Sequence, residues 1–203
     1  MDSHPLELRV AMPATARRDR LHVVIRLLLL VALAALGMSS LYWVLYVAIP
    51  AFVALRLSAG GAQRYLHEDA PRITRVLRWF AAVYAYLWLL TDELPSAENE
   101  GPVELTLEPS GQPTVRTALL RLLTSLPALL LLALLSMVAV VLWIIGAIAI
   151  LLSERLPPGI ADFIAMKLRY QFRLVAYHFS LAPRYPALTD VHAPPHADRP
   201  REA

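Results

Sequence analysis

The chain has 203 residues, of which 58% are hydrophobic and 17% are charged. Soluble globular proteins average about 45–50% apolar and about 25% charged residues, so this composition favours a membrane protein and excludes an intrinsically disordered one. The absence of cysteine excludes disulfides, thiol nucleophiles and thiolate metal sites. The formal net charge at pH 7 is +3, and Lys167 is the only lysine among the 19 lysine and arginine residues.

Two short stretches of the chain alternate apolar and polar side chains. Residues 6–10 read Leu-Glu-Leu-Arg-Val, and residues 103–108 read Val-Glu-Leu-Thr-Leu-Glu. Alternation with a period of two is typical of a strand that buries one face. Proline precedes both stretches, at Pro5 and Pro102. We therefore expect two short strands.

Each alternating stretch is followed by a long segment without any charged side chain. These uncharged segments run over residues 27–55 and 122–152. A helix needs about 20 apolar residues to cross a hydrocarbon core about 30 Å thick. Both segments exceed this length, so the sequence predicts a transmembrane helix in each. The first segment is not a secretory signal peptide, because it is too long and no small-residue cleavage site follows it.

An amphipathic helix is expected after each uncharged segment. The two helices cover about residues 71–91 and about residues 158–181, and a proline near each start suits the first turn of a helix. The second helix carries too many charges to cross lipid, and the uncharged part of the first is too short for a full span. We therefore expect both to lie at the membrane interface, in contact with anionic lipid headgroups or a partner protein. The residues expected to make these contacts are Arg75, Arg78, Trp79, Lys167, Arg169 and Arg173.

The order of strand, uncharged helix, turn and amphipathic helix occurs twice, which predicts an internal repeat. From Leu77 onward the matching residues keep one constant spacing. Repeated membrane units pack about a pseudo-symmetry axis, either as a duplicated anchor or around a transport site between them. The matching segments are Pro5-Leu6-Glu7-Leu8 with Pro102-Val103-Glu104-Leu105, Arg26-Leu27-Leu28 with Arg121-Leu122-Leu123, Leu77-Arg78-Trp79 with Leu168-Arg169-Tyr170, and Ala85-Tyr86 with Ala176-Tyr177.

The expected fold class is an all-α integral membrane protein. Two tandem repeats of short strand, long transmembrane helix and amphipathic interfacial helix cover residues 1–97 and 98–188. Residues 189–203 are rich in Pro, His, Asp and Arg, and we expect them to form a disordered tail.

The motifs and their order resemble a bacterial family known as domain of unknown function 4389. The first repeat keeps Arg64-Tyr65, Arg78-Trp79, Ala85-Tyr86 and Leu90-Thr91-Asp92, and the second keeps Pro127, Arg155, Pro157, Ala176-Tyr177 and Tyr185-Pro186. The departures are Leu66, Leu94, Tyr170 and Ala182-Pro183, where the family pattern has Pro, Tyr, Trp and Thr-Asp. The resemblance covers nearly the whole chain outside the tail. It implies a bacterial membrane protein and no assigned activity.

Three arrangements in the membrane fit the charges. Arginines at 17, 18, 20 and 26 place the N-terminus in the cytoplasm by the positive-inside rule. A helix of about 31 residues is roughly 46 Å long, so one tilted span per repeat is the simplest arrangement, with the repeats in opposite orientations. Arginine flanks both ends of both uncharged segments, which also fits a re-entrant hairpin in each repeat, with residues 37–40 at the first bend. Two crossings per repeat are the third arrangement.

Motifs for catalysis and for cofactor binding are missing from the sequence. The uncharged segments hold no ionisable side chain, which disfavours a pump or an ion-coupled carrier. His192 and His196 have the spacing of metal ligands on a helix, with Asp190 and Asp198 nearby, but the two prolines between the histidines prevent that helix. Arginines with aromatic neighbours also occur in nucleic-acid-binding proteins, but beside membrane segments they fit lipid headgroups. We therefore expect no metal, no cofactor, no nucleic acid and no enzymatic activity.

Two functional hypotheses follow. The first is a non-enzymatic subunit or scaffold of the bacterial inner membrane, multi-pass, that packs against another membrane protein. The second is a lipid- or small-molecule-handling transport component with a site between the two repeats. A polar cleft lined by both repeats would favour the second hypothesis, and an apolar groove would favour the first.

Overall fold

The computed structural model describes residues 6–10, 17–35, 38–93 and 103–187. Within these residues the chain is mostly helical, as expected, with one two-stranded sheet. Strands β1 (Leu6–Val10) and β2 (Val103–Leu107) form where the sequence alternates. The helices are α1 (Arg20–Ala35), α2 (Met38–Arg64), α3 (Ala70–Leu87), α4 (Val115–Thr124), α5 (Leu126–Ser153) and α6 (Pro158–His178), with a π-helix, η1 (Tyr65–Asp69), between α2 and α3. The expected tail lies outside the described residues.

The two strands pair in antiparallel orientation over their full length. The apolar face of the pair is buried, with β1 against α6 and β2 against α3. The opposite face exposes Glu7, Arg9 and Glu104. The register places Leu6 opposite Leu107, Leu8 opposite Leu105 and Val10 opposite Val103.

The first uncharged segment forms two helices, which corrects the expectation of one long helix. α1 ends at Ala35 and α2 begins at Met38, and residues 36–37 lie outside the described part of the chain. A helix boundary therefore falls where the hairpin arrangement places its bend.

The second uncharged segment is also divided. α4 ends at Thr124 and α5 begins at Leu126, with Ser125 between them. Pro127 stands in the first turn of α5. Proline has no N–H for the hydrogen bond that would continue α4, whereas the first turn of a new helix does not need that bond. The remaining helix, α5, has 28 residues and is about 42 Å long.

A kink lies near the end of α2. α2 continues to Arg64, but Gly61 has φ 73° and ψ 174°. Glycine adopts this left-handed φ without the steric cost that other residues meet. η1 then leads directly into α3, which begins at Ala70 with Pro71 in its first turn, close to the expected start of the amphipathic helix.

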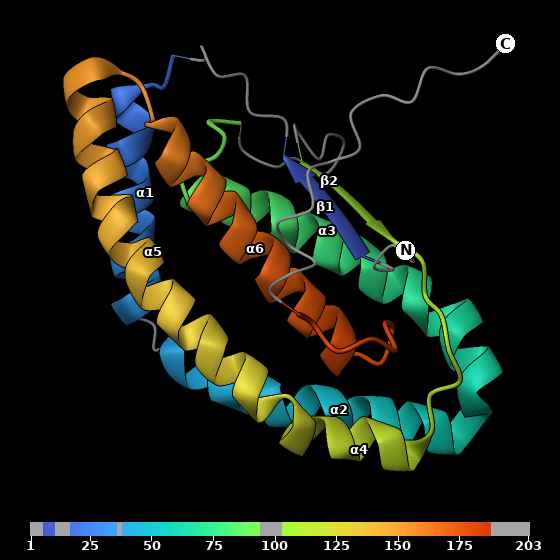
Figure 1. The fold of residues 1–203 in the computed structure, drawn as a ribbon. Coiled ribbons are helices and arrows are strands. Elements are labelled where there is room, and N and C mark those ends of the chain that lie inside the picture. Colours follow the sequence, from blue (N-terminus) through green and yellow to red (C-terminus); the bar gives the residue numbers. More distant parts are fainter. Residues whose placement is uncertain (1–5, 11–16, 36–37, 94–102, 188–203) are drawn as a thin grey trace, which may run out of the picture.

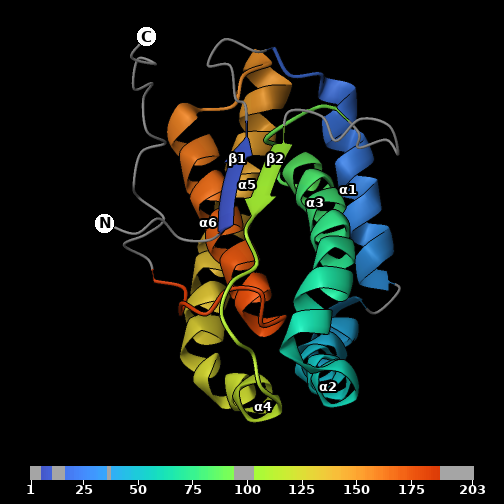
Figure 2. The same cartoon turned by 90° about the vertical axis from the view of Figure 1, so that its right-hand side faces the viewer.

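Four helices form a curved outer layer around the other two. Figure 1 shows α1 and α5 along one side and α2 and α4 along the bottom, with α3 and α6 inside this arc and the β pair on its open side. In Figure 2 the β pair lies between α6 and α3. Leu77, Ile164 and Leu168 are buried in the core between these inner elements. Burying one such side chain contributes about 1.5–3 kcal/mol.

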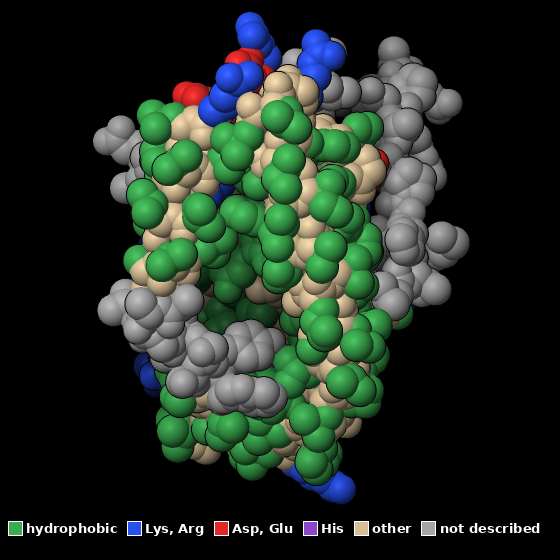
Figure 3. All heavy atoms as spheres, turned by 90° about the vertical axis from the view of Figure 1, so that its left-hand side faces the viewer, with side chains coloured by type: hydrophobic (Ala, Val, Ile, Leu, Met, Phe, Trp, Pro, Cys, Tyr) green, Lys and Arg blue, Asp and Glu red, His purple; other side chains and the backbone are tan. Residues whose placement is uncertain are grey.

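The outer layer exposes apolar side chains along its length. Among the described residues, Val44–Leu87 and Leu126–Ser153 are helical stretches long and apolar enough to cross a membrane. Only 22% of the most apolar part of each is buried, whereas a core helix of a soluble protein is mostly buried. Figure 3 shows an apolar face with charged side chains at its upper and lower ends, and a hollow between α1 and α5 lined by hydrophobic side chains. This surface indicates membrane association.

Candidate functional site

α3 ends in a turn that requires a residue in the left-handed conformation. Leu89 has φ 67°, and its N–H donates to the Tyr86 carbonyl at 3.2 Å. The Leu90 N–H donates to the Ala85 carbonyl at 2.9 Å. These two bonds form a Schellman motif, in which glycine is the usual left-handed residue. Both leucine side chains are fully buried, and their burial offsets the backbone strain.

α6 ends in the same turn. Ser180 has φ 57°, and its N–H donates to the Tyr177 carbonyl at 3.0 Å. The Leu181 N–H donates to the Ala176 carbonyl, also at 3.0 Å. These four residues follow their counterparts at the end of α3 at the constant spacing noted from Leu77 onward. Both helices therefore end with a non-glycine residue at the left-handed position.

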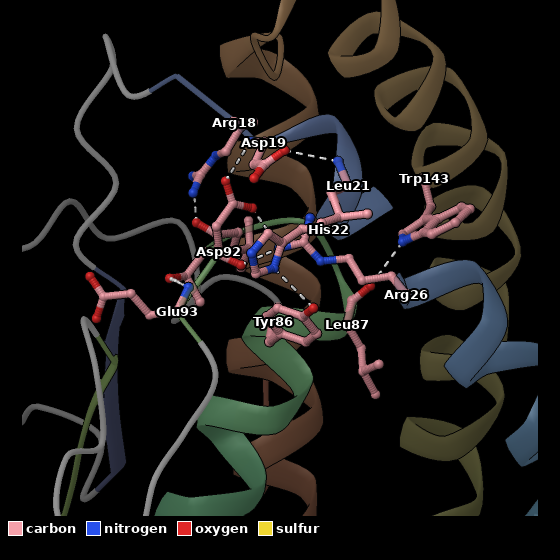
Figure 4. Close-up of polar contacts among 12 residues, drawn as sticks. Arg18, Asp19, Leu21, His22, Arg26, Tyr86, Leu87, Asp92, Glu93 and Trp143 are labelled. Carbon is pink, nitrogen blue, oxygen red and sulfur yellow. Dashed lines mark hydrogen bonds and ion pairs between the residues drawn. The ribbon is translucent and has the colours of Figure 1, made fainter. Parts of the chain in front are cut away.

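Arg26, from the first half of α1, is buried beside the turn that ends α3. Its guanidinium carbon lies 4.5 Å from the centre of the Tyr86 ring. Its Nη2 donates to the Thr91 carbonyl and, at 2.7 Å, to the Asp92 carboxylate. His22 Nδ1 lies 3.0 Å from the Tyr86 hydroxyl. Figure 4 shows His22, Arg26 and Asp92 together with Tyr86 at the end of α3. We call Arg26, Tyr86, Thr91 and Asp92 the Arg26 cluster.

The chain just before α1 extends this cluster. Arg18 Nη2 donates to the Leu90 carbonyl at 2.6 Å, and the Asp19 N–H donates to the Asp92 carboxylate at 3.0 Å. The Arg18 N–H donates to the Glu154 carbonyl at 2.8 Å. Burial lowers the pKa of Arg18, and the Asp92 carboxylate opposes this shift. The start of α1 is thereby tied to the ends of both α3 and α5.

Arg121, from α4, holds the equivalent place at the end of α6. Its guanidinium carbon lies 4.3 Å from the centre of the Tyr177 ring. Its Nη1 donates to the Tyr177 carbonyl and, at 3.0 Å, to the Ala182 carbonyl. Tyr177 and Ala182 follow Tyr86 and Thr91 at the same constant spacing. We call Arg121, Tyr177 and Ala182 the Arg121 cluster.

The two clusters differ in the charge next to the arginine. Pro183 stands where the first cluster has Asp92, so the carboxylate that pairs with Arg26 has no equivalent at this place. Arg121 is held by an aromatic face and two carbonyl oxygens instead. A stacked ring and carbonyl acceptors stabilise a buried guanidinium without a second charge.

Two cations expected at the membrane surface lie inside the protein. Lys167 is only 3% exposed. Its Nζ donates a hydrogen bond to Gln171 Oε1 at 2.6 Å and lies 4.2 Å from the centre of the Trp88 ring. Burial lowers the pKa of Lys167 to about 7. Arg173 is buried as well, and Arg169 is half-buried. This corrects the expectation that α6 presents Lys167 and Arg173 to lipid headgroups, because α3, α4, α5 and β1 pack around α6.

The expected contact residues of α3 are more accessible. Arg75 and Trp79 are exposed, and the Trp79 ring packs edge-on against Phe80 at 5.1 Å between ring centres. Arg78 is half-buried, and its Nε donates to the Leu105 carbonyl at 3.3 Å, which ties α3 to β2. Contact of Arg75 and Trp79 with lipid headgroups or a partner stays a prediction.

Sequence reasoning did not identify the two arginine clusters as sites. The signal was present, because Arg26 and Arg121, and likewise Tyr86 and Tyr177, were among the matching residues of the repeat. Recurrence does not reveal that an arginine before an uncharged segment reaches a tyrosine far along the chain. That contact depends on the packing of α1 against the end of α3 and of α4 against the end of α6.

Comparison with known protein families relates the second half of the chain to one of them. Residues 116–188 match the model of a family described as Domain of unknown function (DUF4389). The matched region contains α5, α6, nearly all of α4 and the whole Arg121 cluster. No curated protein and no solved structure matches the chain.

Proposed function

We propose that this chain is a non-enzymatic integral membrane protein of the bacterial inner membrane that packs laterally against another membrane protein. The observation that carries the proposal is the apolar outer layer. Leu28 on α1 is 64% exposed, and Met137 and Leu152 on α5 are 69% and 77% exposed. Each Å² of such surface left in water costs about 25 cal/mol, and lipid or an apolar partner removes this cost.

The arginine clusters support two repeats of one membrane unit, at residues 1–97 and 98–188. Arg26 and Arg121 make the same contacts, a stacked tyrosine ring and a carbonyl just beyond a Schellman turn. Arg26 reaches the carbonyl from α1, and Arg121 reaches it from α4. In both cases the uncharged segment begins at the residue after the arginine. A recurrence of sequence, backbone turn and side-chain contact together favours a duplicated unit, and extends the family resemblance to the first half.

The polar contacts support a structural role. Arg56 on α2 donates two hydrogen bonds to the Asp69 carboxylate, at 2.9 and 2.7 Å, and thereby fixes the kinked passage from α2 into α3. Trp143 Nε1 on α5 donates to the Leu87 carbonyl at the end of α3, at 2.9 Å. Each of these bonds joins two elements of the fold, so these polar groups stabilise the structure.

The hollow between α1 and α5 is the contact surface that we propose for the partner. Hydrophobic side chains line it in Figure 3, so it suits an apolar helix of another membrane protein. A lipid-handling role is the second candidate, because one acyl chain has the same apolar character. An apolar lining favours either occupant over a polar substrate.

Site-specific photo-crosslinking in intact cells tests these proposals. A photoreactive phenylalanine derivative is introduced in the full chain at Leu28 on α1 or at Ile148 on α5, both exposed, with Glu104 on the β pair as the matched control. We expect one defined protein adduct from Leu28 and Ile148 and none from Glu104. Lipid adducts alone at these positions would favour the second candidate. Release of the chain by alkaline carbonate would overturn the integral membrane assignment.

A further inference from the structure

We infer that the chain enters the bilayer from one side only, so that the helix pairs α1–α2 and α4–α5 each begin and end at the same membrane surface. The inference rests on the proposed function and specifies its orientation. It differs from the single tilted span per repeat that is the simplest interpretation of the sequence.

The β pair marks the axis that relates the two repeats. Leu8 and Leu105 hold matching places in the repeats, and they lie directly opposite each other in the ladder. The repeat match also carries the cross-strand pair Leu6–Leu107 onto the pair Val103–Val10. A two-fold rotation that exchanges the repeats therefore passes through the Leu8–Leu105 pair. The contacts between elements obey the same rotation. It carries the contact of α6 with β1 onto that of α3 with β2, and the contact of α2 with α4 onto that of α5 with α1.

A single span per repeat would place this axis in the middle of the bilayer. Membrane repeats of opposite orientation are related by an axis in the membrane plane, so an element on that axis lies halfway through the hydrocarbon. The element on the axis here is the β pair, whose outer face exposes Glu7, Arg9 and Glu104. It is a two-stranded sheet, and neither strand has a further strand beside it among the described residues. Exposed charges and open sheet edges do not occur in the hydrocarbon, which excludes this direction of the axis.

An axis along the membrane normal avoids this conflict. Both repeats then have the same orientation, with the β pair, α3 and α6 toward the headgroups and the arc of α1, α2, α4 and α5 in the hydrocarbon. Figure 1 shows the β pair on the opposite side of the molecule from this arc. Charged groups lie at both ends of the arc. At one end Arg17 and Arg20 form ion pairs with Glu154 at 2.6 and 3.5 Å. At the other end Arg64 forms an ion pair with Glu68 at 2.9 Å.

The division of the uncharged segments fits entry and return at one surface. α1 has 16 residues and is about 24 Å long, which is less than the roughly 30 Å of a hydrocarbon core. The end of α5 returns to the start of α1, where the Arg18 N–H donates to the Glu154 carbonyl at 2.8 Å. The chain thus leaves its second apolar segment at the membrane surface where it entered the first. Single spans of opposite orientation would return it there too, so the short length of α1 is the observation that favours one-sided entry.

Single cysteines test the orientation, and the natural chain contains none that would interfere. We choose Gln63→Cys, Gln112→Cys and Ser153→Cys, all exposed and uncharged, so that the arginines that govern orientation are unchanged. Met137→Cys, on the exposed face of α5, reports on the hydrocarbon. Each full-length variant is treated with an impermeant maleimide in intact cells and after permeabilisation.

We expect Gln63→Cys, Gln112→Cys and Ser153→Cys to be protected in intact cells and labelled after permeabilisation, and Met137→Cys to stay unlabelled in both. Labelling of all three from outside would also support one-sided entry and reverse the cytoplasmic assignment. External labelling of Gln63→Cys and Gln112→Cys, with Ser153→Cys protected, would overturn the inference in favour of single spans. Labelling of Met137→Cys from the opposite side would overturn it in favour of two crossings.

Failure of the inference is distinct from failure of the proposed function. If the variants remain in the membrane after alkaline carbonate but label on opposite sides, only the one-sided orientation is wrong. If the natural chain is recovered in the soluble fraction, the membrane assignment itself is wrong.

Discussion

Arg26 lies across the face of Tyr86, with its guanidinium carbon 4.5 Å from the ring centre, although the two residues are in different helices and far apart in the chain. The same relationship recurs between Arg121 and Tyr177 at 4.3 Å. In both places the arginine also binds a carbonyl beyond the end of the helix that carries the tyrosine. Each arginine therefore joins a helix end that lacks glycine to another helix, α1 for Arg26 and α4 for Arg121.

Removing the buried arginine should destabilise the fold. Arg26→Met leaves the Thr91 carbonyl and the Asp92 carboxylate without their guanidinium partner, and we expect the free energy of unfolding to fall by about 2–4 kcal/mol. Thermal unfolding in detergent, followed by circular dichroism, measures the change. The matched control is Arg20→Met, whose side chain is exposed and, among the described residues, pairs with Glu154 at 3.5 Å, and which should cost less than about 1 kcal/mol. Equal losses in the two variants would show that burial of Arg26 is not the cause.

Glycine should have opposite effects at the two left-handed positions. Ser180→Gly removes the strain at φ 57° together with a buried hydroxyl that has no hydrogen-bond partner among the described residues, and we expect a gain of about 1 kcal/mol. Leu89→Gly relieves the same strain but deletes a fully buried side chain, so we expect a net loss of about 1–3 kcal/mol. Thermal unfolding of both variants checks the signs. A loss in Ser180→Gly would contradict this account of the turn.

Stability should rise with pH above neutrality because of Lys167. Burial lowers its pKa from 10.5 to about 7, so below pH 7 both folded and unfolded chains hold the proton and this group adds no pH dependence. Between pH 7 and 10.5 the unfolded chain binds the proton and the folded chain does not, so stability increases by up to about 1.4 kcal/mol per pH unit. Unfolding at pH 7, 8 and 9 measures this slope.

Lys167→Met keeps the side-chain volume and removes the titrating group, so it is the control for this pH dependence. We expect its unfolding temperature to be flat over the same pH range and higher than that of the natural chain at pH 7, because no ammonium is buried. A slope that survives in Lys167→Met would assign the pH dependence to another group.

Exposed and buried cations should differ in their effect on bound lipid. Arg75 is exposed on α3, whereas Lys167 is enclosed beside Trp88. A cation near an anionic leaflet contributes about 1 kcal/mol, so Arg75→Ala should reduce the anionic lipid that co-purifies in mild detergent, and Lys167→Met should not. Mass spectrometry of the retained lipids gives the comparison. A reduction in Lys167→Met alone would contradict the expected headgroup contact of Arg75.

Much of the secondary structure was determined by local pattern. The alternating residues at 6–10 and 103–107 predicted both strands, and the prolines near 71 and 158 predicted the starts of the two inner helices. These features follow from side-chain periodicity and from the missing N–H of proline, which act over a few residues. The uncharged segments likewise predicted the apolar helices, because length and hydropathy are properties of the sequence alone.

The surroundings of the charges were decided only by tertiary structure. The sequence predicted Lys167, Arg169 and Arg173 at the membrane interface, but four other elements cover α6, and Lys167 lies against Trp88 from the end of α3. The contacts of Arg26 and Arg121 are equally invisible to a local pattern, since each joins residues more than fifty positions apart. Whether a cation meets water, lipid or an aromatic ring depends on which helices pack around it, and that packing is set by the burial of the whole apolar surface rather than by the residues next to it in sequence.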